Sequence, residues 1–116
     1  MSSLAPDALP VVSGADAVRE VAAGAVLLDV RERNEWDAGH APQAASLPMS
    51  EINSRIEELP REGHVVVTCR SGNRSQAVVR YLVAQGVDAV NLDGGMNAWR
   101  AAGGDVVADN GNPTII

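Results

Sequence analysis

Cys69 is the only cysteine of the chain, and the residues after it offer hydrogen-bond donors and positive charge. Consecutive backbone N–H groups in a loop can converge on an anion, a glycine lets the backbone curl, and arginines add attraction for an anion. The pattern predicts an anion cradle with a sulfur atom at its floor. In this prediction Cys69 is the catalytic nucleophile, and the substrate-binding loop consists of Arg70, Ser71, Gly72, Asn73, Arg74 and Ser75.

A single cysteine leaves two interpretations of its chemistry. It excludes an internal disulfide and a zinc site built on several thiolates, so the thiol is either buried and inert or reactive. A free thiol has a pKa of about 8.5, and a helix N-terminus or a nearby arginine lowers that pKa. Both features are encoded beside Cys69. The sequence therefore favours a reactive thiolate that acts by covalent catalysis.

The segments around Cys69 predict the elements that position it. Residues 65–68 are Val-Val-Val-Thr, which is typical of a strand buried on both faces, and the apolar spacing after Ser75 predicts a covering helix. Ligands of open α/β sheets bind at the carboxyl ends of such strands, where Cys69 falls. Further strands are predicted at residues 11–12, 25–30, 44–48 and 87–92, and further helices at 13–24, 50–59 and around Trp99.

Asp29 lies near the end of the apolar strand at residues 25–30, so its carboxylate needs a partner. Arg31 is one candidate and a loop arginine is the other. We expect Asp29 and Arg31 to support the site as a structural ion pair, since such networks shift charges without taking part in chemistry. His40 has no second histidine nearby, so we expect a structural role for it and no metal site.

Three stretches together resemble the single-domain rhodanese-like sulfurtransferase family. The first is the loop that begins at Cys69. The second, residues 29–42, has Asp-Val-Arg, an acid beside an aromatic residue, then Gly-His and a proline; the third, residues 94–103, has Gly-Gly, a bulky residue, Ala-Trp and a final glycine. The resemblance covers roughly residues 11–107. Ala41 and Gln43 depart from the family's usual larger aliphatic residue and glycine, which affects packing and a turn.

The resemblance implies an α/β fold of rhodanese-like type, with a five-stranded, mainly parallel sheet flanked by helices on both faces. It also implies a thiosulfate sulfurtransferase. Such an enzyme moves a sulfane sulfur from thiosulfate or a related donor to a thiol, cyanide or protein acceptor, in ping-pong fashion through a persulfide on Cys69. Asp29 and Arg31 would support the site, and no cofactor is expected.

Two other functions stay open at this point. Phosphatases and arsenate reductases on related folds clasp a tetrahedral oxyanion with an arginine five intervening residues after the cysteine, whereas Arg74 follows Cys69 after four. The shorter loop makes a tighter ring, better suited to one sulfur atom than to a phosphate, so sulfur transfer is favoured. The other alternative is a protein-binding module with little catalysis, although such modules usually lack the cysteine.

Composition limits the remaining possibilities. A length of 116 residues predicts one domain: a flexible N-terminal arm at residues 1–10, a rhodanese-like domain at 11–108 and a C-terminal tail at 109–116. The net charge of −6 argues against a nucleic-acid partner. The start lacks a secretory signal, and no apolar run approaches the ~20 residues of a membrane span. We therefore expect a cytoplasmic protein without a membrane partner, and nothing in the sequence specifies an oligomeric state.

Overall fold

A computed structural model describes residues 9–59 and 63–116, so residues 1–8 of the expected arm lie outside the described part. Strands and helices alternate along the chain, as expected for an α/β protein. In chain order the elements are β1 (Val11–Val12), α1 (Gly14–Ala22), β2 (Val26–Asp29), α2 (Arg33–Ala38), β3 (Ala45–Ser46), the short 3-10 turns η1 (Met49–Glu51) and η2 (Ile56–Glu58), β4 (His64–Thr68), α3 (Arg74–Ala84), β5 (Asp88–Leu92) and α4 (Gly95–Ala101).

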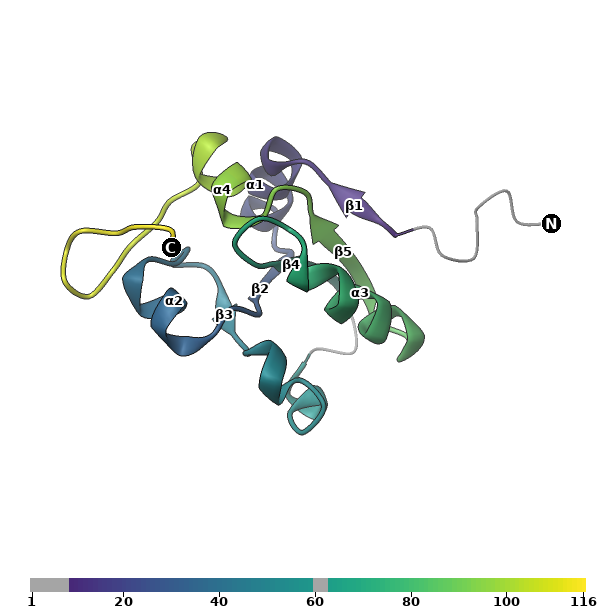
Figure 1. The fold of residues 1–116 in the computed structure, drawn as a ribbon. Coiled ribbons are helices and arrows are strands. Elements are labelled where there is room, and N and C mark those ends of the chain that lie inside the picture. The colour runs from purple at the N-terminus through teal and green to yellow at the C-terminus, as the bar shows by residue number, and fades with distance from the viewer. Residues whose placement is uncertain (1–8, 60–62) are drawn as a thin grey trace.

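The five strands form one sheet in the order β1-β5-β4-β2-β3, and the pairings between neighbouring strands are parallel (Figure 1). The central strand, β4, lies between β2 and β5. Its register pairs Thr68 with Asp29 and Val67 with Asn91. The carboxyl ends of three strands therefore meet where Cys69 begins its loop, which confirms the predicted α/β sheet.

Helices cover both faces of the sheet, and β4 explains why. Its valines alternate between the two sides, so the strand is apolar throughout and buried on both faces. Val65 and Val67 pack beneath α3 with Val78 and Leu82. In the opposite core α1 and α4 pack on the sheet, with Ala17, Val21, Met96 and Trp99 from the helices and Leu27, Val66 and Leu92 from the strands.

The ends of α1 and α3 fall at residue types that favour helix termini. The side chain of Ser13 accepts a hydrogen bond from the Asp16 backbone N–H at 3.1 Å and so caps α1. Gly24 and Gly86 directly follow the last turns of α1 and α3 with φ of 113° and 85°, the left-handed conformation that glycine adopts most readily.

The helix predicted over residues 50–59 is wrong: the segment holds η1 and η2 joined by turns. Instead of capping a helix, the Ser50 hydroxyl donates to Glu32 at 3.1 Å. Leu59 precedes a proline, which disfavours helical backbone, and it is extended with ψ of 145°. Ile52 and Leu59 are nevertheless buried in the core. The apolar spacing therefore indicates correctly which side chains are buried, but not that the backbone is helical.

The tail at residues 109–116 turns back onto α2. The Thr114 N–H donates to the carbonyl of Ala38 at 2.9 Å, and Ile115 packs against the core beneath α1 and α4. Gly39 allows the approach, because a Cβ there would lie 2.5 Å from the Thr114 carbonyl oxygen. Within residues 9–59 and 63–116, no helix has the length and apolar character to cross a membrane.

Candidate active site

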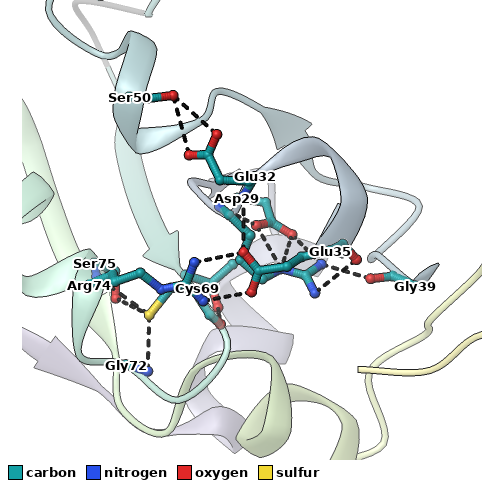
Figure 2. A network of polar contacts seen from close by, with 11 residues as sticks. Asp29, Glu32, Glu35, Gly39, Ser50, Cys69, Gly72, Arg74 and Ser75 are labelled. Carbon is teal, nitrogen blue, oxygen red and sulfur yellow. Dashed lines mark hydrogen bonds and ion pairs between the residues drawn. The ribbon is translucent and has the colours of Figure 1, made fainter. Parts of the chain in front are cut away.

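Cys69 directly follows β4, and 1% of it is exposed. Three groups from its own loop converge on its sulfur (Figure 2): the N–H of Gly72 at 3.2 Å, the N–H of Ser75 at 3.4 Å, and the Ser75 hydroxyl at 3.3 Å. Ser75 belongs to the first turn of α3, so the helix N-terminus also faces the sulfur. The structure thus gives Cys69 the donor-lined surroundings that the sequence predicts.

These contacts change the acidity of the thiol. Burial on its own raises the pKa of Cys69, because it disfavours the charged thiolate. Hydrogen bonds from the hydroxyl and N–H of Ser75 and from the N–H groups of Gly72 and Ser71 oppose burial, and together they hold the pKa below its ordinary value. A larger thiolate fraction at neutral pH makes Cys69 a better nucleophile than a free cysteine.

The N-terminus of α4 supports the other side of the loop. The N–H groups of Met96 and Asn97 donate to the carbonyls of Cys69 and Arg70 at 2.8 and 3.1 Å. Gly95 makes this approach possible: it has φ of 57°, and a Cβ on it would lie 2.4 Å from the Cys69 carbonyl oxygen. The Gly-Gly stretch of the sequence therefore fixes the carbonyl side of the loop, leaving the N–H groups to face the sulfur.

The two loop arginines have different surroundings. Arg74 reaches from α3 to α2 and donates through both terminal nitrogens to the two carboxylate oxygens of Glu35, each at 2.7 Å (Figure 2). This hydrogen-bonded pairing lowers the pKa of Glu35 and raises that of Arg74. Arg70 is exposed, and no ion pair of it is found among the described residues. Glu35 is a site residue that the sequence reasoning missed.

Asp29 and Arg31 form a buried ion pair, and both side chains are 0% exposed. Nη2 of Arg31 lies 2.7 Å from one carboxylate oxygen, while Nε lies 3.0 and 3.1 Å from the two oxygens. The same guanidinium donates to the carbonyl of Glu35, within α2, and to that of Gly39, directly after α2. The pair therefore anchors the helix that carries the Arg74 partner, and the structure joins neither residue to Cys69 by a hydrogen bond.

The remaining predicted loop residues, Ser71, Gly72 and Asn73, differ in exposure. Ser71 and Asn73 are exposed, and Asn73 precedes α3 without a side-chain capping bond. Gly72 is buried with φ of 96°, a conformation that favours glycine. Among the described residues, no group of three or more histidine, cysteine, aspartate or glutamate side chains is placed to hold a metal ion.

Asn91 is a second residue that the sequence reasoning missed. Its side chain, 2% exposed, accepts a hydrogen bond from the Ser75 hydroxyl and donates to the Gly72 carbonyl at 3.0 Å. Asn91 therefore contacts both residues, Gly72 and Ser75, whose groups surround the Cys69 sulfur. The available signal was an amide side chain within an otherwise apolar strand at residues 87–92, since a buried amide needs hydrogen-bond partners.

The fold and the site define an α/β protein with a cysteine of lowered thiol pKa in a loop of main-chain donors at the carboxyl edge of the sheet. The sequence model of the Rhodanese-like domain matches residues 14–102. The chain belongs to the rhodanese-like family.

Relatives of known description agree with this assignment. A putative sulfurtransferase, YtwF, of Bacillus subtilis is 45% identical over 73 residues, which span 63% of this chain and 71% of the relative. The thiosulfate sulfurtransferase GlpE of Pseudomonas syringae is 40% identical over 87 residues, 74% of this chain and 80% of the relative. The crystal structure of a rhodanese-related protein from Thermoplasma volcanium superposes with a TM-score of 0.80 at 32% identity, covering 86% of this chain and 99% of that one.

Proposed function

We propose that the protein is a sulfurtransferase in which Cys69 carries a sulfane sulfur from thiosulfate, or a related donor, to a thiol, cyanide or protein acceptor. The observation that carries this proposal is the set of Gly72 and Ser75 donors around a buried sulfur of lowered thiol pKa. Family membership and the relatives named sulfurtransferases support it.

In the first half-reaction the Cys69 thiolate attacks the outer sulfur of thiosulfate. The new bond joins Sγ to that sulfur, the sulfur–sulfur bond of thiosulfate breaks, and sulfite leaves with the bonding electron pair. The enzyme now holds a persulfide whose outer sulfur carries the negative charge. Loop N–H groups beside Sγ are suited to stabilise that charge, as an oxyanion hole stabilises oxygen.

In the second half-reaction a nucleophilic acceptor attacks the outer sulfur. With cyanide, the new carbon–sulfur bond produces thiocyanate, and the persulfide bond breaks so that Sγ leaves as the thiolate. The donors that lower the thiol pKa also favour this step, because a more stable thiolate is a better leaving group. The same contacts therefore assist both halves of a ping-pong cycle.

The arginines divide two tasks in this proposal. Arg70, exposed at the loop, attracts the anionic donor in a chain whose net charge is −6. Arg74 fixes α3 to α2 through Glu35. A phosphatase would need an arginine free to clasp the phosphate by two parallel hydrogen bonds. Both terminal nitrogens of Arg74 are already bound to Glu35, which supports sulfur transfer over phosphate or arsenate chemistry.

The test is turnover with thiosulfate and cyanide, measured as thiocyanate released. We expect activity in the native chain, none in Cys69→Ser, and no phosphate released from an aryl phosphate. Activity that survives Cys69→Ser would refute covalent catalysis by Cys69. Phosphatase activity without thiocyanate release would favour the oxyanion alternative, and neither activity with any donor would favour a binding module.

A further inference from the structure

Asn91 lies at the carboxyl end of β5, beneath the cysteine loop. In the parallel register it pairs with Val67 of β4, two residues before Cys69. Its neighbours along the strand are apolar and its side chain is buried, so each polar atom of the amide needs a partner. Both atoms have one, and both partners belong to the loop: Gly72 and Ser75.

The amide can face only one way. A carbonyl oxygen accepts and never donates, so the atom of Asn91 next to the Gly72 carbonyl is the NH₂ group, Nδ2. Oδ1 consequently faces the Ser75 hydroxyl, which must be the donor in that contact. A serine hydroxyl has a single proton. While Ser75 donates it to Asn91, Ser75 can only accept at Cys69, from the thiol S–H at 3.3 Å.

We propose that Asn91 is a positioning residue that holds the Ser75 hydroxyl, which donates to Asn91 while the Cys69 sulfur is uncharged and turns to donate to that sulfur while it is a thiolate. A charged acceptor makes the stronger hydrogen bond, so the O–H bond of Ser75 turns from Asn91 to the thiolate. Oδ1 of Asn91 is then left buried without a donor, which opposes formation of the thiolate.

We call this turning of the Ser75 hydroxyl between Asn91 and Cys69 the hydroxyl switch. Its role rests on the proposed function, because the charge on Sγ changes at each step of the sulfur-transfer cycle. Before attack Sγ is a thiolate and Ser75 donates to it. In the persulfide Sγ is uncharged and the negative charge lies on the outer sulfur, so the hydroxyl returns to Asn91. When the acceptor removes the outer sulfur, Sγ leaves as a thiolate and the hydroxyl turns to it again. Only an O–H bond rotates, and no proton is transferred.

The other charges around the loop are the same whichever way the hydroxyl points. The elements packed around Cys69 contribute these ionisable groups: Arg70 in the loop, Arg74 of α3 with Glu35 of α2, Asp29 at the end of β2, Arg31 after β2, and Asp93 after β5. None is removed by a change at Asn91 or Ser75. A shift in the acidity of Cys69 on such a change therefore reports the hydroxyl and its acceptor.

The test measures the rate of Cys69 alkylation by iodoacetamide against pH, in the full chain. Because the chain has one cysteine, the midpoint of this profile belongs to Cys69 alone. We expect Asn91→Leu to lower the midpoint by about one pH unit, because Ser75 is then free to donate to the thiolate. Ser75→Ala should raise the midpoint, and adding Asn91→Leu to Ser75→Ala should leave it where Ser75→Ala put it.

Gln76→Leu is the matched control. The Gln76 side chain also donates to the Gly72 carbonyl, at 3.2 Å, but the hydroxyl of Ser75 is bonded to Cys69 and Asn91 and not to Gln76. Loss of the Gln76 side chain therefore tests anchoring of the loop without changing the hydrogen bonds of the hydroxyl. We expect an unchanged midpoint. An unchanged or raised midpoint in Asn91→Leu would overturn the proposal. So would a midpoint that falls as much when Asn91→Leu is added to Ser75→Ala as when it is made alone.

A measurement without substitution covers the case in which Asn91→Leu fails to fold. In the native chain, the NMR resonances of the Asn91 side-chain amide should titrate with the alkylation midpoint of Cys69, and their failure to do so would contradict the switch. Alkylation and titration need no sulfur donor. A chain that transfers no sulfur would refute the proposed function and leave these results interpretable, while normal turnover with unshifted midpoints would refute only the switch.

Discussion

Replacing Asp29 with alanine leaves the guanidinium of Arg31 buried without its carboxylate. The substitution removes three hydrogen bonds from Arg31 side-chain nitrogens, and the Arg31 backbone N–H also loses its acceptor, a carboxylate oxygen 3.0 Å away. The guanidinium keeps the carbonyls of Glu35 and Gly39. These neutral partners satisfy donors but do not balance the positive charge.

The expected loss of stability is about 3–5 kcal/mol, the usual result of removing one partner from a fully buried ion pair. Both side chains are 0% exposed, so water cannot replace the lost carboxylate. Against a total free energy of unfolding of about 5–15 kcal/mol for a domain, this loss is large. Exchanging both partners for apolar residues, as Asp29→Ala with Arg31→Met, should recover most of it, because no unpaired charge stays buried.

Urea unfolding measures the change, and the fluorescence of buried Trp99 is a suitable signal. Arg19→Ala is the control: it breaks the pair with Asp16, whose side chains are 71% and 49% exposed, and should change stability by no more than about 0.5 kcal/mol. A loss of less than about 1 kcal/mol in Asp29→Ala, or a double variant no more stable than Asp29→Ala alone, would contradict the expected effect of an unpaired buried charge.

Three further predictions concern the loop and a distant surface site. Arg70→Ala should raise the KM for thiosulfate several-fold with kcat unchanged, and the effect should shrink as salt increases; equal KM values would contradict steering by Arg70. Gly95→Ala should lower the free energy of unfolding in urea by more than about 1 kcal/mol, because the φ of 57° and the nearby Cys69 carbonyl leave no room for a Cβ. A variant as stable as the native chain would contradict this.

The third prediction concerns His64, where burial opposes the charge on the ring. Hydrogen bonds that the ring donates to the carboxylates of Asp88 and Glu20, at 3.0 and 2.8 Å, outweigh burial and raise the His64 pKa. The charged histidine therefore stabilises the fold fully below its ordinary pKa of about 6.5, and this contribution is lost as pH rises through the raised folded value. The Tm difference between the native chain and His64→Gln should narrow as the pH rises; a constant difference would contradict it.

Local patterns predicted much of the fold. The β-branched run before Cys69 and the segment at residues 13–24, which begins with a capping serine, are local features with one dominant structural outcome. The strand and the helix predicted there are both confirmed. The segment at residues 50–59 has apolar spacing that suits a helix, but the structure has two 3-10 turns there, and the Ser50 hydroxyl donates to Glu32. Glu32 lies 18 residues earlier, so this contact could not be read from the local sequence.

The loop around Cys69 was predictable from residue types, whereas the residues that organise it were not. Glu35 and Asn91 are distant in sequence from the loop residues they bind: Glu35 precedes Arg74 by 39 positions, and Asn91 follows Ser75 by 16. Their contacts follow from the order of strands in the sheet, which brings β2, β4 and β5 together. A polar residue in an apolar strand marks the need for a partner but does not identify it.

The central claim is that Cys69 carries the transferred sulfur, and intact-mass spectrometry after incubation with thiosulfate tests it most directly. We expect that the native chain gains the mass of one sulfur atom, that cyanide removes this mass, and that Cys69→Ser gains nothing. A native chain that gains no sulfur from thiosulfate or from persulfide donors, or a Cys69→Ser chain that gains the same adduct, would contradict it.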